Sequence, residues 1–600
     1  MLLPALRRYN GGMHCASLTA TIAAFGTACA ATPQVDLSPA RWPAGELERF
    51  AERDATFGGQ NQLATSKRGV VTGTTGATAV RAGLEALRQG GSAADAALTT
   101  SLTQIALAAG SWVSYAGVLT MVYYDAESGE VVSLNAAYDT FAAEDDPLSI
   151  PRQTAAGGEP TPSGRTALVP GYMAGVGAAH ARFGKLPFEQ LFVPALYFAE
   201  EGFRLSELHG ALLAHRKDVL DRLPETRAVF TKGDGSFFAA GDLFRQPALA
   251  ETLRAVAANG AREMYTGPWA ERFVEAVRRE GGKVTADDLA TYEPLWCEPV
   301  RFPYRGFEVA GPGLPAQGGA QVAEAMQLAA AADLAAMGHY SESPAAFFWL
   351  AQITDLMALS YLDDPIARMM VGSKDISLAA RSTAAHAAAL WERMEAGECR
   401  LTRVPETSDP KHSDAIVAID RWGNVAAVCH TINTTSWGET GLFVGGVSIP
   451  DSASFQQALI GRTEPGERLP DPTEPLIVLR DGKPYAALSS IGAGLHQKTV
   501  ATLLNLLDRG DGIKEAVDAA SQHLPSWGAG GRTTVQVFAG DFDAGLLEAV
   551  RGLGHDVEVI RNDLSSRAPR GYVVGARIDP ETGEYQAVAT DTLNGRALGL

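Results

Sequence analysis

Residues 411–441 read KHSDAIVAIDRWGNVAAVCHTINTTSWGETG, and this stretch decides the fold. Its two largely apolar runs, SDAIVAID and NVAAVCHTIN, are separated by Arg421-Trp422-Gly423, which is typical of a β-hairpin. The preceding segment, LTRVPETSDPKH at 401–412, is polar, contains two prolines and has no periodicity, so it predicts an exposed linker. A polar linker that ends where a strand begins marks the bond before Ser413 as a candidate processing site.

Further hairpins lie on both sides of this stretch. PLIVLRDGKPYAALSS at 475–490 predicts a hairpin with Asp481-Gly482 in its turn. GVLTMVYYDAESGEVVSLNAA at 117–137 predicts another, with Ser128-Gly129 in the turn. A strand–helix–strand unit over 533–560 and a last hairpin over 572–589 are also expected.

Helical patterns occupy most of the remaining chain. Alanine-rich helices follow a strand near Val70, and Gly90-Gly91 interrupts them. Residues 171–337 are interpreted as mostly amphipathic helix, and residues 338–400 as further helix. Strand pairs inside and helices outside predict a layered α/β architecture in one large domain.

Charge and composition limit the possible partners. The 600 residues include 69 acidic and 50 basic side chains, giving a net charge of −19. Nucleic acid and anionic membrane surfaces both require a basic face, so neither is expected as a partner. After residue 35 no apolar run is long enough to span a membrane. Five scattered cysteines with no CxxC pair argue against a disulfide framework or a structural zinc site.

The first 35 residues form a separate segment. Arg7 and Arg8 precede a mildly apolar stretch, and Ala28-Cys29-Ala30 offers small residues at the spacing of a cleavage site. This pattern predicts an export signal, which would place the mature protein in the periplasm or outside the cell. The alternative is a disordered extension, or a start placed too early with Met13 as the true one, in a cytoplasmic protein.

The signatures of ordinary hydrolases are missing from the sequence. It contains no GxSxG elbow, no HExxH pair and no P-loop. The histidines show no metal-ligand spacing. Neither a metal nor an organic cofactor is expected. A conventional serine hydrolase would have to use His430 or His496 as its base, and a packed or solvated histidine is the simpler interpretation of each.

The 411–441 stretch resembles the start of the small subunit of the γ-glutamyltransferase family. In that family a catalytic threonine opens a strand, a Gly-Asn turn follows, and the return strand ends in Thr-x-Asn-Thr-Thr. The resemblance places Ser413 at the nucleophile position and gives Thr431 and Asn433 the task of holding it. SSIGAGLHQKTV at 489–500 is similar to the segment whose two glycine amides form the oxyanion hole, here Gly492 and Ala493.

Upstream segments such as LVPGYMAGV at 168–176 and YRGFEVAGPGLPAQGG at 304–319 also resemble the family, in the family's order. The resemblance implies a four-layer αββα sandwich of the N-terminal-nucleophile (Ntn) hydrolases. It also implies a zymogen that cleaves itself between His412 and Ser413. The expected products are a large subunit, residues 36–412, and a small subunit, residues 413–600, which stay together as a heterodimer.

The chemistry of such a site can be stated without the family. A serine hydroxyl is a poor nucleophile at neutral pH and needs a base. A cut before Ser413 places a new α-amine, with a reference pKa of about 7.7–8.0, on the nucleophile's own residue. One residue then supplies both nucleophile and base, so no triad histidine is required.

The resemblance fails where the family binds its glutamate group. Ala137 stands at the place of an arginine that holds the α-carboxylate. Ser454 lies in a segment where an aspartate binds the substrate's amino group, and Asp471 replaces the first of two serines that contact the carboxylate. Losing an arginine–carboxylate pair removes a bidentate, charge-assisted contact. We therefore expect a small-molecule amide or peptide substrate whose acyl group is not γ-glutamyl. The alternative is an unprocessed, non-catalytic binding protein on the same fold.

Overall fold

The computed structural model describes residues 35–55, 62–152, 161–357, 368, 372, 375–399, 413–527, 533–561, 571–590 and 593–600. The predicted export signal and the linker with His412 lie outside these ranges, and both stay predictions. Residues 36–600 belong to a single structural unit.

Two seven-stranded antiparallel sheets form the centre of this unit. Sheet I has the order β21 (Arg596–Gly599), β2 (Val70–Gly73), β10 (Ser413–Ile419), β11 (Val425–Thr431), β3 (Val118–Asp125), β4 (Glu130–Ala136) and β7 (Leu295–Cys297). Sheet II has the order β1 (Ala64–Ser66), β20 (Tyr585–Ala589), β19 (Tyr572–Ile578), β15 (Lys483–Ile491), β14 (Leu476–Arg480), β9 (Phe307–Gly311) and β8 (Val300–Tyr304).

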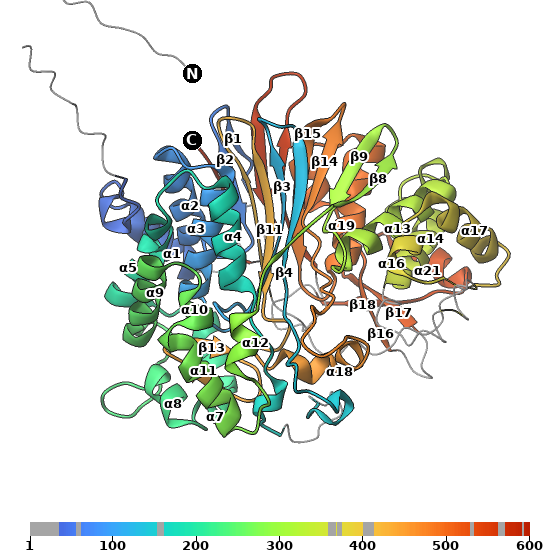
Figure 1. The fold of residues 1–600 in the computed structure, drawn as a ribbon. Coiled ribbons are helices and arrows are strands. Elements are labelled where there is room, and N and C mark those ends of the chain that lie inside the picture. The colour runs from blue at the N-terminus through green and yellow to red at the C-terminus, as the bar shows by residue number, and fades with distance from the viewer. Residues whose placement is uncertain are drawn as a thin grey trace, which may run out of the picture. The chain divides into compact units, whose positions relative to one another are not determined.

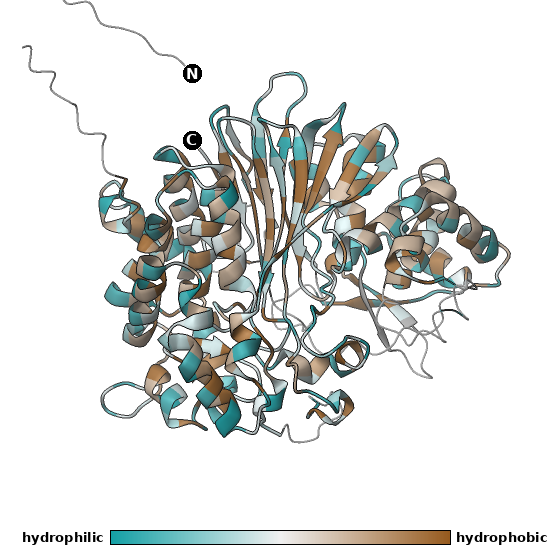
Figure 2. Ribbon diagram, in the orientation of Figure 1, coloured by the Kyte–Doolittle hydropathy of each residue, from teal (hydrophilic) through white to brown (hydrophobic). Residues whose placement is uncertain are grey.

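The sheets pack face to face with helices on both outer sides (Figure 1). A buried apolar cluster with members from both sheets, including Val417 of β10 and Ala487 of β15, fills the space between them. Helices α2 (Ala77–Arg88) and α3 (Ala93–Leu107) cover the outer face of sheet I. Helices α13 (Gly318–Ala331), α19 (Leu495–Leu504) and α20 (Ile513–Asp518) cover sheet II. Figure 2 shows the apolar strands enclosed by helices with polar outer surfaces. The predicted αββα sandwich is confirmed.

The other helices surround these layers. They are α1 (Glu46–Ala55), α4 (Tyr172–Phe183), α5 (Val193–Glu201), α6 (Glu207–His215), α7 (Lys217–Leu220), α8 (Pro224–Phe230), α9 (Pro247–Asn259), α10 (Glu263–Thr266), α11 (Pro268–Arg279), α12 (Ala286–Ala290), α14 (Pro344–Leu356), α16 (Leu378–Arg381), α17 (Ala384–Glu395), α18 (Gln457–Ile460) and α21 (Ala544–Gly552). Three small sheets join β5 (Phe203–Arg204) to β6 (Leu243–Phe244), β12 (Leu442–Val444) to β13 (Val447–Ile449), and β16 (His523–Trp527) to β17 (Thr533–Phe538) and β18 (Asp556–Ile560).

The predicted hairpins are all present, as β10–β11, β14–β15, β3–β4 and β19–β20. The expectation of mostly helix over 171–337 is wrong for residues 295–311, which form β7, β8 and β9. Arg305 and Gly306 both have positive φ, 45° and 85°, and they make the tight turn between β8 and β9. Alternating burial along β8 shows the period of two that a helical interpretation overlooks.

Strands from the two sides of Ser413 are interleaved in both sheets. In sheet I, β10 and β11 lie between β2 and β3, and the C-terminal strand β21 pairs with the outer side of β2. In sheet II, β14 pairs with β9, and β20 pairs with β1. The chain before the linker and the chain from Ser413 onward therefore build one shared core.

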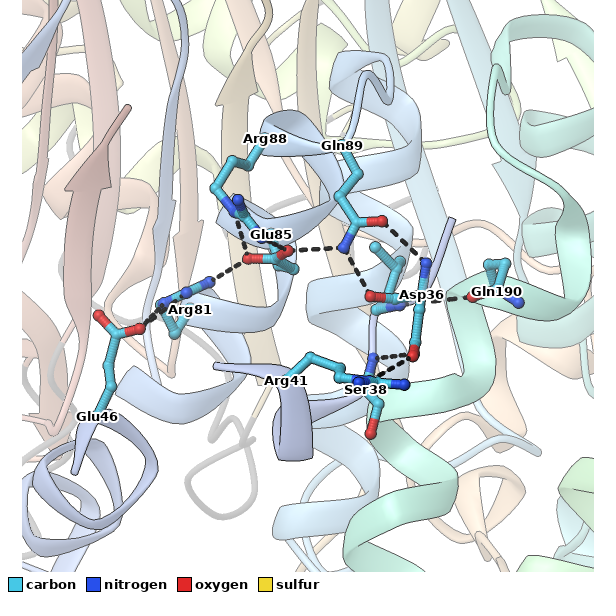
Figure 3. A network of polar contacts seen from close by, with 10 residues as sticks. Asp36, Ser38, Arg41, Glu46, Arg81, Glu85, Arg88, Gln89 and Gln190 are labelled. Atoms are coloured by element: carbon cyan, nitrogen blue, oxygen red, sulfur yellow. Dashed lines mark hydrogen bonds and ion pairs between the residues drawn. The ribbon is translucent and has the colours of Figure 1, made fainter. Parts of the chain in front are cut away.

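A polar network ties the start of the described chain to α2 (Figure 3). The Arg81 guanidinium lies between the carboxylates of Glu46 and Glu85, at 2.8 and 3.0 Å. The Gln89 side chain donates to the Asp36 carbonyl at 2.6 Å and accepts from the Asp36 amide at 2.9 Å. These contacts fix residues 36–46 on the helix that follows β2.

Candidate active site

Ser413 is the first residue of β10, near the middle of sheet I, and only 8% of it is exposed. It pairs in register with Thr431, the last residue of β11. The Ser413 hydroxyl donates a hydrogen bond to the Thr431 hydroxyl at 2.7 Å. Alternate residues of β10, among them Ala415 and Val417, belong to the core between the sheets. By the period of two, the Ser413 side chain faces sheet II.

Asn433 extends this contact. Its backbone N–H donates to the Thr431 hydroxyl oxygen at 3.1 Å, and its φ of 51° lies in the left-handed region that asparagine tolerates. Its side-chain nitrogen Nδ2 donates to Asp471 Oδ2 at 2.7 Å. A carboxylate can only accept, so this contact fixes the orientation of the amide. The oxygen Oδ1 of Asn433 therefore points away from Asp471.

Asp471 reaches the site from sheet II. It lies just before β14, it is 1% exposed, and its Oδ1 accepts from the Thr473 amide at 2.9 Å. The Thr473 hydroxyl in turn donates to the Thr120 hydroxyl on β3 at 2.8 Å. Ser413, Thr431, Asn433 and Asp471 thus form one hydrogen-bonded chain that crosses from one sheet to the other.

Gly492 and Ala493 follow the end of β15. The Ser489 hydroxyl on this strand donates to the Val428 carbonyl of β11 at 2.9 Å, so the two strands lie opposite each other. Because β15 is antiparallel to β14, its last residues lie at the same edge of sheet II as Asp471. Gly492 has a φ of 87°, which favours glycine. The predicted oxyanion segment is therefore at the edge of the sandwich where Ser413 lies.

A buried carboxylate, Asp414, lies directly behind the serine, on the opposite face of β10. Its Oδ1 accepts from the hydroxyls of Thr75 at 2.6 Å and Thr74 at 3.1 Å, and its Oδ2 accepts from the indole nitrogen of Trp112 at 3.1 Å. Burial raises the pKa of Asp414 to about 7, against the lowering effect of these three donors. The sequence interpretation missed this residue. The signal was present, because an acid inside a fully buried strand requires partners.

The two histidines considered as alternative bases have other partners. His430 Nε2 lies 3.0 Å from Gln104 Oε1, and the Gln104 amide nitrogen donates to a backbone carbonyl, so His430 Nε2 carries the proton. Burial lowers the pKa of His430 to about 3. His496 Nδ1 lies 3.0 Å from Glu474. These contacts argue against either histidine acting as the base for Ser413.

The three predicted substrate-pocket positions differ in their surroundings. Ala137 is buried, and its amide donates to Asn135 Oδ1 at 3.0 Å. The Ser454 hydroxyl donates to the Asp451 carbonyl of its own turn at 2.6 Å. Of the three, Asp471 alone belongs to the hydrogen-bonded chain that begins at Ser413. Asp471 therefore becomes the residue of greatest interest for specificity.

No group of three or more His, Cys, Asp or Glu side chains in the described ranges could hold a metal ion. None of the helices that the structure describes is long and apolar enough to cross a membrane.

Comparisons with known proteins agree with this architecture. The fold is that of the Ntn hydrolases, in the variety found in γ-glutamyltranspeptidases and related acylases. A crystal structure of cephalosporin acylase from Bacillus halodurans superposes with a TM-score of 0.73, covering 90% of this chain and 97% of that chain. At 21% identity this match shows the fold alone.

The family model described as gamma-glutamyltranspeptidase matches residues 79–598, so this chain belongs to the γ-glutamyltranspeptidase family. The glutathione hydrolase proenzyme of Pseudomonas sp. strain A14 is 27% identical over 476 residues, covering 74% of this chain and 80% of its own. The acylase ACY 1 proenzyme of Pseudomonas sp. strain V22 is 26% identical over 490 residues, covering 78% and 84%. The chain is thus an enzyme of this amidohydrolase and acyltransferase family. These matches give no support to a non-catalytic binding protein.

Proposed function

We propose that the chain cuts itself before Ser413 and that the mature enzyme then cleaves an amide through an acyl ester on Ser413. The observation that carries this proposal is the 2.7 Å hydrogen bond from the Ser413 hydroxyl to Thr431, at the first residue of a buried central strand. The relatives' names support processing, because both are called proenzymes. His412 and the linker lie outside the described residues.

The self-cleavage follows from the position of the hydroxyl. Ser413 Oγ attacks the carbonyl carbon of His412 and loses its proton, and the peptide C–N bond breaks as the Ser413 nitrogen takes up a proton. The resulting ester is opened by water. The products are a carboxylate on His412 and a free α-amine on Ser413.

In the mature enzyme the α-amine serves as the base. With a reference pKa near 8 it accepts the Ser413 hydroxyl proton close to neutral pH and later returns it to the leaving amine. Asn433 Oδ1, which points away from Asp471, is the acceptor that holds the amine. The amides of Gly492 and Ala493 stabilise the tetrahedral oxyanion, and one such donor is typically worth about 10²–10³ in rate.

The acyl group is proposed to differ from γ-glutamyl. An alanine at 137 offers no charge to a carboxylate, and the Ser454 hydroxyl is used within its own turn. Asp471 adds a negative group beside the nucleophile's hydrogen-bonded chain. These three residues support hydrolysis or transfer of another acyl group. The proposed subunits are residues up to 412 and residues 413–600, held together by the interleaved sheets.

A denaturing gel with intact mass measurement tests the proposal. Wild type should give two fragments, and N-terminal sequencing of the smaller should begin at Ser413. Ser413→Ala should remain one chain, whereas Ser413→Thr, which keeps the hydroxyl, should still be cut. A single intact chain in all three samples would reject self-processing and favour a binding protein instead.

A further inference from the structure

We propose that Asp471 makes this enzyme select acyl donors that carry a cationic group and reject donors that carry a carboxylate. The inference rests on the proposed function, because it assumes that the acyl group is bound at Ser413. Beyond that function, it specifies the charge of the acyl donor and the residue that recognises this charge.

Asp471 lies close to Ser413 along a short chain of hydrogen bonds. Asp471 is linked to Ser413 through only two residues, the Thr431 hydroxyl and the backbone N–H and side chain of Asn433, by contacts of 2.7, 3.1 and 2.7 Å. An acyl group attached to Ser413 Oγ would be bound at the edge of the sandwich where Ser413, Asp471 and Gly492 lie. A group a few bonds from the acyl carbonyl is therefore within reach of the carboxylate.

The Asp471 carboxylate has spare hydrogen-bonding capacity. An ionised carboxylate has about four acceptor sites. In the described part of the chain Asp471 accepts two hydrogen bonds, one from Asn433 Nδ2 and one from the Thr473 amide. Both donors are neutral. The carboxylate can accept further hydrogen bonds, and an ammonium or guanidinium group is the donor that binds a carboxylate best.

Within the described ranges no cationic side chain is paired with Asp471. None of the ion pairs among the described residues involves Asp471. Arg468 is the nearest arginine in the sequence, but its guanidinium donates to Asp139, to the Asn135 carbonyl and side chain, and to the Glu293 carbonyl. It also lies over the Tyr292 ring. Arg468 is thus committed to other partners.

The charge that acts on β11 near the site is negative. Cys429 on β11 has a pKa raised by burial and by the negative charges of Asp471, Asp414 and Glu474. Asp471 makes the largest of these charge contributions, and it acts on a buried point of β11 two residues from Thr431. A donor with a carboxylate meets repulsion at this site, and a donor with a cation meets attraction.

The test uses 4-nitroanilides of matched length. Their acyl groups are 6-aminohexanoyl, with a cation, hexanoyl, which is neutral, and adipoyl, with a terminal carboxylate; γ-glutamyl, with both charges, is the fourth. For cleaved wild type we expect kcat/KM to fall in the order 6-aminohexanoyl, hexanoyl, adipoyl, by about tenfold or more at each step. γ-Glutamyl should be poorer than 6-aminohexanoyl.

Asp471→Asn should bring the three matched substrates to within a few-fold of one another, because it removes the charge while keeping an acceptor for Asn433. Asp471→Ser, which is smaller, provides a second variant should the asparagine protein not fold. The control is Asp481→Asn, which removes an equal charge from the exposed turn between β14 and β15. Asp481 has a φ of 52°, which asparagine also adopts, so this variant should keep the wild-type order.

The outcomes separate the two proposals. Wild type that is cut at Ser413 but prefers adipoyl or γ-glutamyl substrate, or turns over none of the four, overturns the role of Asp471. An order of kcat/KM among the substrates that does not change in Asp471→Asn also overturns the role of Asp471. An uncut, inactive wild type instead rejects the proposed function itself.

Discussion

The hydroxyls of Ser413 and Thr431 lie 2.7 Å apart across the register pair that closes the hairpin β10–β11. The Thr431 hydroxyl oxygen accepts from the Ser413 hydroxyl and also from the Asn433 amide. The Ser413 hydroxyl is therefore held in one orientation at the start of a strand that is buried throughout. This preorganisation is the feature that the first prediction tests.

Thr431→Val should slow self-cleavage by roughly 10²-fold, because it keeps the shape of threonine but removes the acceptor for Ser413. The time course of the smaller fragment on a denaturing gel measures the effect. Thr431→Ser retains the hydroxyl and should be processed at nearly the wild-type rate. Equal rates for the valine and serine variants would exclude a role for this hydrogen bond.

Gly492→Ala should lower both stability and activity. A Cβ at a φ of 87° costs roughly 1–2 kcal/mol, and relief of that strain would turn the amide proposed to face the oxyanion. Thermal unfolding and kcat are the two measurements. Ala493→Gly is the matched control, because it keeps the amide and adds no strain, so kcat should be retained. Normal activity in Gly492→Ala would argue against the proposed oxyanion hole.

Arg468→Met should destabilise the protein by about 2–4 kcal/mol, because it leaves the Asp139 carboxylate, whose side chain is 16% exposed, without its charge partner. Denaturant unfolding of the uncut Ser413→Ala protein gives the free energy of unfolding without the complication of two fragments. Adding Asp139→Asn to Arg468→Met should recover part of the loss. No recovery in the double variant would assign the effect to the contacts of Arg468 with backbone carbonyls.

Buried His430 should make the protein lose stability in acid. Its pKa in the folded protein, about 3, is below the ordinary value of 6.5. Between pH 3 and pH 6.5 the unfolded chain therefore binds one more proton at this histidine than the folded protein does. This contribution is complete above pH 6.5 and is lost as pH falls toward 3, by at most about 1.4 kcal/mol per pH unit. His430→Gln keeps a donor for Gln104 and should flatten the dependence of the melting temperature on pH. An unchanged slope would contradict the prediction.

Asp414 should have the opposite effect on the pH dependence of stability, favouring the folded state in acid. Its folded pKa, about 7, is above the ordinary 3.8, so its contribution to stability is complete below pH 3.8 and is lost as pH rises through 7. Asp414→Asn lacks this dependence but loses the acceptor for Trp112. The variant should therefore be more destabilised, relative to wild type, at pH 5 than at pH 8. Melting temperatures of both proteins at the two pH values check this, and an equal difference at both would refute it.

The sequence was informative where pattern and turn chemistry act locally. The hairpin β14–β15 could be predicted because Asp481 and Gly482 suit a turn with positive φ at both positions. The hairpin β8–β9 was overlooked because a short, half-exposed strand pair gives a weak signal beside long helices. The strand β21 could not be inferred from four residues, because only its pairing with β2, more than 500 residues earlier in the chain, makes it a strand.

The candidate site was predictable in part. Ser413, Thr431 and Asn433 share one hairpin, so their proximity follows from local sequence. The contact of Asn433 with Asp471 depends on the packing of two sheets, and the partners of Asp414 come from the segments around Thr74 and Trp112. No local pattern encodes such distant pairs. The family resemblance marked Asp471 as a candidate pocket residue, but no local pattern showed what it touches.

Because strands from both sides of Ser413 are interleaved in the two sheets, folding must come before cleavage. A chain cut before Ser413 holds β10 and β11 between strands that belong to the other piece, so the shape it keeps was assembled while it was still continuous. Once unfolded, the two pieces would meet only as separate molecules, without the tether that first aligned them. A cut protein that is unfolded by heat or denaturant is therefore expected not to refold, so its unfolding should be irreversible.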